Sequence, residues 1–120
     1  MLTVELDFPA PELFPNRSKG KHWGALHAHK TSARDAAHWQ TMACKPLPKF
    51  TGKELMLTIT FEMPDKRHRD TDNCLAAAKS ALDGVASALA VDDRRFNPLK
   101  IYRKHGKPPG KMIVQIEETK

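Results

Sequence analysis

The chain has 120 residues, of which 40% are hydrophobic and 28% are charged, and its mean hydropathy is −0.55. These values predict one ordinary globular domain, and no apolar run approaches the roughly 18 residues that a membrane span needs. Two cysteines, Cys44 and Cys74, are too few for a disulfide framework and form no CxxC pair, so reduced thiols are expected. Because the first residues alternate apolar and acidic side chains, no signal peptide is predicted, and a cytoplasmic protein without membrane contacts is expected.

The charge of the chain is unevenly distributed along a sequence with a formal net charge of +6. Residues 16–69 hold 11 Lys and Arg against four Asp and Glu, and residues 99–120 hold six against two. Between them, residues 70–98 hold five aspartates against three basic residues. The cationic excess favours a polyanionic partner such as nucleic acid, and the acidic island within it indicates a separate chemical role.

The first part of the chain predicts a strand, a loop and a helix. Alternating apolar residues over 2–8 are typical of a half-buried strand. Residues 9–30 lack periodicity and are rich in Pro, Gly and cations, which predicts a long basic loop. Trp23 lies among these cations, a composition suited to phosphates and stacked bases, although a solvated loop is the alternative. An Ala-rich segment over 31–45, which opens close to a capping-box pattern and ends before Pro46, predicts a helix.

The second part predicts a strand, a helix and a hairpin. Residues 54–63 show the clearest alternation, and residues 72–89 form a helix that would pack on the sheet through Leu75, Ala78, Leu82, Val85, Ala86 and Leu89. Gly84 is expected to face away from that stripe. Residues 99–104 and 112–118 read as a hairpin with a long loop. The element order β-α-β-α-β-β predicts an α+β fold over residues 1–120, with a small mixed sheet of about four strands and two helices on one face.

Two pairs of aspartates flank the helix predicted over 72–89. Asp70 and Asp72 follow a basic run, and Asp92 and Asp93 come after the helix. Carboxylate oxygens suit Mg²⁺, which would let acidic residues approach a nucleic-acid phosphate that the surrounding cations hold. The structural alternative is a helix N-cap for the first pair and a solvated turn, paired with the two following arginines, for the second.

Lys79 lies on the same flank of this helix as Asp72. The two residues are seven positions apart, about 10 Å along a helix axis, so contact between them would need substrate or metal in between. A surface pair of Lys79 with Asp83 is the alternative.

Residues 63–73 read Met-Pro-Asp-Lys-Arg-His-Arg-Asp-Thr-Asp-Asn, followed by Ala-Leu-Asp-Gly at 81–84 and by Asp92-Asp93. With these motifs, the sequence resembles the RusA family of Holliday junction resolvases, which is found in bacteria and often encoded by prophages. Asn16-Arg17, His22-Trp23 and Lys30 are similar to the basic N-terminal segment of that family. The resemblance extends over about residues 15–95, with its motifs in order around one helix.

The resemblance implies a Mg²⁺-dependent homodimeric endonuclease that nicks two strands of a four-way DNA junction symmetrically. Asp70, Asp72 and Asp93 would be catalytic metal-binding carboxylates, with Asp92 as a metal-binding neighbour. Some family members have a lysine four residues after the second aspartate, where this chain has Ala76, and Lys79 is the expected substitute. The DNA-binding candidates are Arg17, Lys19, Lys21, His22, Trp23, Lys30, Lys66, Arg67 and Arg69.

Two other functions fit the same residues. One is a basic DNA- or RNA-binding module without catalysis, whose aspartates serve as caps and turns. The other is a nuclease that cuts simpler substrates than a four-way junction. Cleavage of junction, three-way and linear DNA with and without Mg²⁺ separates the three.

Overall fold

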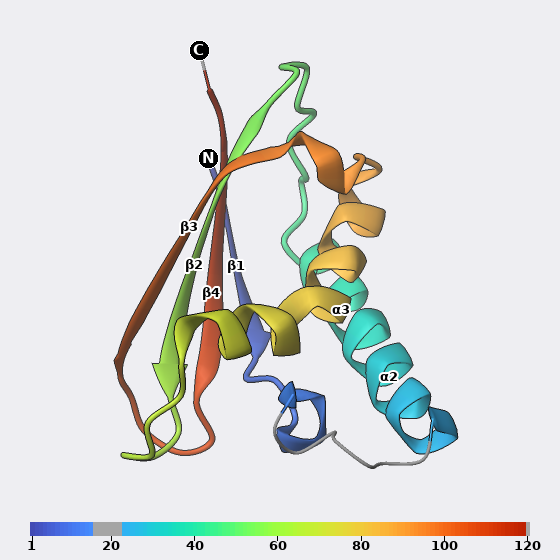
Figure 1. Ribbon diagram of the computed structural model, residues 1–120. Helices are drawn as coiled ribbons and strands as arrows, with labels where there is room; N and C mark the ends of the chain where they lie inside the picture. The colour runs from blue at the N-terminus through green and yellow to red at the C-terminus, as the bar shows by residue number, and fades with distance from the viewer. Residues whose placement is uncertain (16–22, 120) are drawn as a thin grey trace.

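A computed structural model describes residues 1–15 and 23–119 of the chain. Its elements are β1 (Leu2–Asp7), the 3₁₀ turn η1 (Pro11–Leu13), α2 (Trp23–Met42), β2 (Leu55–Met63), α3 (Thr71–Leu89), the 3₁₀ turn η2 (Asp93–Arg95), β3 (Phe96–His105) and β4 (Lys111–Glu118) (Figure 1). The predicted α+β fold, with two helices and a mixed four-stranded sheet, is confirmed. Within the described ranges, no helix combines the length and apolar character needed to cross a bilayer.

The strands are arranged in the order β1-β4-β2-β3, with β4 antiparallel to both of its neighbours and β3 parallel to β2. The predicted hairpin is therefore wrong, because β2 lies between β3 and β4. The connection from β3 to β4 crosses the end of β2, and two glycines permit this close approach. A Cβ on Gly106 would lie 2.8 Å from the Met63 carbonyl oxygen, and Gly110, at φ +76°, would bring a Cβ 2.8 Å from that of Glu62.

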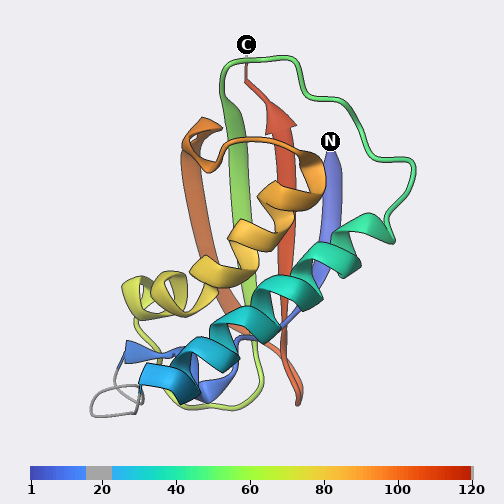
Figure 2. The same cartoon turned by 90° about the vertical axis from the view of Figure 1, so that its right-hand side faces the viewer.

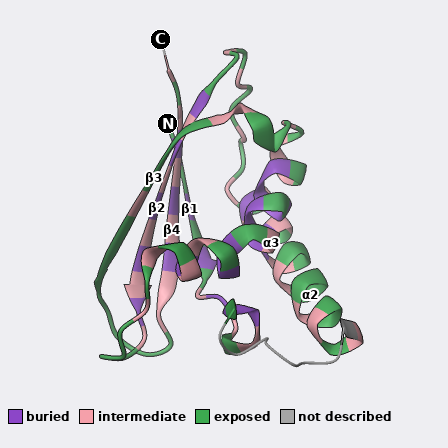
Figure 3. Cartoon of the chain, in the orientation of Figure 1, coloured by how far each residue is buried: buried purple, intermediate pink, exposed green. Residues whose placement is uncertain are grey.

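The core lies between the sheet and the helices, which cover the same face (Figures 2 and 3). Strand β2 alternates buried and half-buried residues along its whole length, which confirms the predicted strand and its apolar face. The inward residues of β2, β4 and β1 are Leu55, Leu57, Ile59, Phe61, Met63, Met112, Val114, Ile116, Leu2, Val4 and Leu6. Edge strand β3 is mostly exposed, and only its half-buried Phe96 and Ile101 pack against the core.

Helix α2 begins at Trp23, eight residues before the predicted start, so the predicted loop over 9–30 and the helix start at 31 are wrong there. Leu26, Ala33 and Ala37 are spaced by seven and four residues and all pack against the core. This spacing continues the apolar face one and a half turns further toward the N-terminus than the Ala-rich segment suggests. Tertiary packing therefore outweighs the low helix propensity of Gly24.

Helix α3 begins at Thr71, within one residue of its predicted start, and ends at the predicted Leu89. Its buried face is wider than predicted, because α2 covers it on one side and the sheet on the other. Gly84, expected to face away, is buried: an added Cβ would fall on the Arg34 carbonyl oxygen and 3.0 Å from the His38 backbone nitrogen of α2. Conversely, Leu75 and Leu89 are only half-buried. Small residues on α3 let the two helices approach closely.

Candidate active site

Asp70 and Asp72 lie at the first turn of α3, at the end of the sheet where β2 terminates. Asp70 occupies the N-cap position, but its side chain accepts no capping hydrogen bond. Its Oδ1 lies instead 2.7 Å from Nε2 of His68, and both side chains are exposed. Asp72 Oδ1 accepts a hydrogen bond from the Asn73 backbone N–H at 3.0 Å. The two carboxylates thus face solvent together at the positive end of the helix dipole, where negative charge is stabilised.

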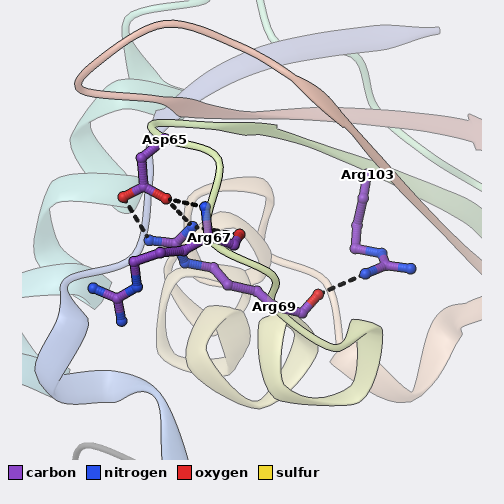
Figure 4. A network of polar contacts seen from close by, with 4 residues as sticks. All are labelled: Asp65, Arg67, Arg69 and Arg103. Carbon is purple, nitrogen blue, oxygen red and sulfur yellow. Dashed lines mark hydrogen bonds and ion pairs between the residues drawn. The ribbon is translucent and has the colours of Figure 1, made fainter.

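The segment that leads into Asp70 is fixed by an ion pair within itself. The Arg69 guanidinium donates to both carboxylate oxygens of Asp65, at 2.8 and 3.2 Å, and the Arg67 backbone N–H donates to the same carboxylate at 2.9 Å (Figure 4). These hydrogen bonds, that of Arg69 first, lower the pKa of Asp65 from 3.8 to about 2. The local fold of this exposed segment is therefore set by charge.

Arg69 also packs on two aromatic rings. Its guanidinium carbon lies 5.4 Å from the centroid of the Phe8 ring and 5.9 Å from that of Phe14, distances at which cations interact with ring faces. Only 14% of the Arg69 side chain is exposed. Arg69, which was predicted to contact DNA, thus binds other residues of its own chain. Lys66 and Arg67, which were predicted to contact DNA with it, are exposed. The i,i+4 spacing of Asp65 and Arg69 is the sequence signal that could have indicated this.

Asp92 and Asp93 lie at the other end of α3, in and before the turn η2. Asp92 is the N-cap of η2: it accepts from the Arg94 backbone N–H at 2.9 Å and from the Arg94 guanidinium at 2.8 Å. These bonds hold the pKa of Asp92 well below its ordinary value. Asp93 is exposed and forms no ion pair with any described residue. Asp92 therefore caps its own turn, and Asp93 is the freer carboxylate of the pair.

The two aspartate pairs are separated by the whole length of α3. The helix has 19 residues, which corresponds to about 28 Å at 1.5 Å per residue. One copy of the chain therefore does not bring Asp93 to Asp70 and Asp72. In the part of the chain that the structure describes, no group of three or more His, Cys, Asp or Glu side chains could hold a metal ion.

The remaining helix residues near the site have distinct surroundings. Lys79 is exposed and its side chain makes no hydrogen bond or ion pair with the described residues, and Ala76 is exposed one turn after Asp72. Cys74 is fully buried, and burial raises the pKa of its thiol, so it is protonated and serves packing. A pocket of about 520 Å³ adjoins Asp70 and is lined by Phe8, Phe14, Arg67, His68 and Asn73, among others.

The residues of the predicted basic loop belong only in part to the described ranges. Arg17, Lys19, Lys21 and His22 lie outside the described residues. Trp23 is the first residue of α2, and Lys30 is exposed on the same helix. Their predicted contacts with DNA stay predictions.

Fold and site together define a small α+β protein with exposed carboxylates next to a cationic segment. No protein-family model matches the chain. It is 31% identical over 123 aligned positions to an uncharacterized protein of Xylella fastidiosa (strain Temecula1 / ATCC 700964), an alignment that covers 97% of this chain and 76% of that protein. The chain belongs to the same family as this bacterial protein.

A second relative has a name that states an activity. The chain is 34% identical over 70 residues to the crossover junction endodeoxyribonuclease rusA of Enterobacteria phage HK97. That alignment covers 58% of this chain and 56% of the phage protein, so the match spans a little over half of each. The partial similarity agrees with the resemblance noted in the sequence.

Proposed function

We propose that this protein is a metal-dependent endonuclease that resolves four-way DNA junctions by paired, symmetric nicks. The observation that carries the proposal is the placement of Asp70 and Asp72. Both carboxylates are exposed and follow directly after a cationic segment, and Asp70 at the N-cap position does not cap the helix with its side chain. Such carboxylates would repel a DNA phosphate unless a cation lay between them. The partial similarity to a phage protein named as a crossover junction endodeoxyribonuclease supports the same reaction.

The donors present fit a hard cation such as Mg²⁺. The Asp70 carboxylate accepts no capping hydrogen bond, and only one oxygen of Asp72 accepts a hydrogen bond from a backbone N–H. Each aspartate therefore has an oxygen that could bind a metal. Asp93 is the third candidate ligand, with Asp92 beside it. When bound, the metal would polarise the phosphodiester and lower the pKa of an attacking water. The chain itself supplies His68, which orients Asp70, and Lys66 and Arg67, which attract the phosphate backbone.

The length of α3 requires a second copy of the chain in this proposal. The length of α3, about 28 Å, separates Asp93 from Asp70, so Asp93 reaches a shared metal site only when two copies place opposite ends of α3 side by side. A two-fold dimer would then hold two equivalent sites. A four-way junction offers two equivalent phosphates, and such a dimer would cut both within one complex.

The test is cleavage of labelled four-way, three-way and linear DNA with and without Mg²⁺. The wild-type chain should cut the four-way junction in the presence of Mg²⁺. Asp72→Asn should abolish cutting while junction binding persists or tightens, because the substitution removes a metal ligand and also a negative charge. Asp35→Asn is the matched control: it makes the same change at an exposed residue of α2 without an ion pair among the described residues, and it should cut normally.

Each other outcome has a definite meaning. A folded Asp72→Asn protein that cuts junctions at nearly the wild-type rate would refute the metal-site assignment. Binding that Mg²⁺ affects only by screening, with no cleavage of any DNA or RNA, would identify a non-catalytic binding module. Cleavage of linear and junction DNA at equal rates would identify a simpler nuclease.

A further inference from the structure

We propose that the cleft between the segment 65–69 and the end of β3 binds a backbone phosphate of the DNA strand, with Arg103 at its centre. This inference rests on the proposed function and adds a subsite to it. The evidence comes from β3, a strand that contributes nothing to the predicted basic loop or to the aspartates.

The end of β3 forms one wall of a pocket of about 250 Å³. In the parallel ladder Arg103 lies opposite Phe61 and His105 opposite Met63, so both lie on the helix-covered face of the sheet. Because β3 is an edge strand, no further strand covers this wall. The pocket is lined by Met63, Asp65, Lys66, Arg67, His68, Arg69, Arg103, Lys104 and His105.

The charge of this pocket is positive after its internal ion pairs are counted. Asp65 is neutralised by Arg69 at 2.8 Å, and Lys104 is paired with Glu62 at 3.4 Å. Lys66, Arg67 and Arg103 form no ion pair with any described residue. Three cations thus converge on the pocket without a carboxylate of the described chain to balance them, which favours an external anion.

Arg103 is held in place by the segment that it faces. Its Nη1 donates a hydrogen bond to the Arg69 backbone carbonyl at 2.6 Å (Figure 4). This is the one side-chain hydrogen bond of Arg103 among the described residues, and a guanidinium has five N–H donors, so four stay available to oxygen acceptors. A planar, pre-positioned guanidinium suits the oxygens of a phosphate.

The position of the pocket explains why a DNA phosphate is the fitting anion. The carbonyl that anchors Arg103 belongs to the peptide bond that joins Arg69 to Asp70. A bound anion therefore lies beside the proposed cleavage site. A DNA strand carries one negative charge per nucleotide, so a strand cut at Asp70 and Asp72 brings a neighbouring phosphate to this pocket.

The experiment measures binding of a labelled four-way junction in EDTA, where no cleavage occurs, between 50 and 200 mM NaCl. Arg103→Gln should lower the slope of log affinity against log salt by about 0.9, the value for one phosphate contact on duplex DNA. Its loss of affinity should accordingly be about 3.5-fold larger at 50 mM than at 200 mM salt. Lys53→Gln removes the same charge at an exposed residue before the start of β2, the opposite end of the sheet, and should leave the slope unchanged.

Two further variants separate charge from structure. Arg103→Lys keeps the charge and should restore most of the slope, whereas loss of a purely structural contact to Arg69 would not be rescued by Lys. Lys66→Gln, in an exposed segment, should lower the slope by a similar amount without any effect on folding. An unchanged slope in Arg103→Gln, or a reduced slope that Arg103→Lys does not restore, would refute the subsite. A wild-type chain that binds no DNA would refute the proposed function as well.

Discussion

Arg69 is in contact with the rest of the chain on three sides. Its guanidinium binds both oxygens of Asp65, the same group lies over the rings of Phe8 and Phe14, and its backbone carbonyl accepts a hydrogen bond from Arg103. The residue that follows it is Asp70. Arg69 therefore positions the first aspartate of the candidate site, and its contacts come from Phe8 just after β1, Phe14 just after η1, and Arg103 of β3.

The Asp65–Arg69 pair gives a measurable prediction. In the wild-type chain, the carboxyl carbon of Asp65 should titrate near pH 2, as read from its NMR chemical shift. Arg69→Gln should move the pKa toward 3.8, because the guanidinium is the largest cause of the shift. Arg67→Gln is the control: Arg67 acts mainly through its backbone N–H, so its substitution should leave the pKa low.

The direction of the linked stability follows from the sign of this shift. The pKa of Asp65 is lower in the folded chain than in the unfolded chain. The ion pair with Arg69 therefore contributes fully to the free energy of unfolding above pH 3.8, and this contribution is lost as the pH falls through about 2. A titration of Asp65 near 3.8 in the wild-type chain would show that the ion pair does not form in solution.

At the scale of the elements, α3 determines both the core and the spacing of the aspartates. It packs against α2 through Gly84, where no side chain fits, and it separates Asp72 in its first turn from Asp93, which lies in the turn η2 after its last residue. The same helix thus links the stability of the fold to the position of the candidate site.

Gly84→Ala should destabilise the protein even though Ala is the better helix former. The added methyl group meets the backbone of α2, and overpacking of this kind costs about 1–3 kcal/mol against about 1 kcal/mol gained in helix propensity. Because the methyl group would meet backbone atoms and not a movable side chain, the upper end of this cost applies, and a net loss of about 2 kcal/mol in urea unfolding is expected. Gly52→Ala is the control, since its Cβ would meet no atom within 3.6 Å; equal stability of the two variants would contradict the close packing.

The elements also show how far sequence reasoning reaches. The alternation and the helical spacing of apolar residues predicted the bounds of β2 and α3 to within one residue. This works because one face of each element is buried, so that apolar residues recur at the period of the strand or the helix. The pairing of β3 with β2 was missed, because strand order depends on contacts between distant segments that no local pattern encodes. Gly84 was assigned to the wrong face because the periodicity does not reveal a second helix packed on α3. The start of α2 was missed because Gly24 and the histidines concealed an apolar spacing.

The candidate site was predictable in composition but not in arrangement. Asp70 and Asp72 lie at the start of a helix, as predicted, and both are exposed, while their role as metal ligands stays a prediction. The length of α3 separates Asp70 and Asp72 from Asp93. The sequence motif does not show this separation, because it groups the three aspartates as ligands of one metal site. The contacts of Arg69 with Phe8 and Phe14 could not be predicted from the sequence, because only the fold brings these two residues, which directly follow β1 and η1, next to Arg69.

At the scale of the whole molecule, the separation of the aspartates predicts a dimer with shared sites. Sedimentation at micromolar concentration should give about 27 kDa, twice the chain mass of 13.5 kDa. A monomer that makes paired nicks in one junction would contradict this arrangement.

Mixing two inactive variants tests the sharing directly. In a dimer of Asp72→Asn with Asp93→Asn, one site loses both residues and the other keeps both, so one intact site forms. Random exchange of subunits should then restore about a quarter of the wild-type nicking, as single nicks rather than paired ones. If each copy held a complete site of its own, every site in the mixture would lack one aspartate and no activity would return.

The pairing of β1 with β4 has a consequence for the order of folding. Leu2 pairs with Ile116 and Val4 with Val114, so this ladder joins segments more than 100 residues apart. Loop closure over such a distance is slow compared with helix formation, and during synthesis the apolar face of β1 stays without its partner until β4 has emerged. Helices α2 and α3 and strand β2 precede β4, and they can collapse around Phe61 first. The sheet should therefore form last at the edge where β1 pairs with β4. Because β4 lies between β1 and β2, a truncation that removes β4 should leave β1 unpaired and separated from the remaining sheet of β2 and β3.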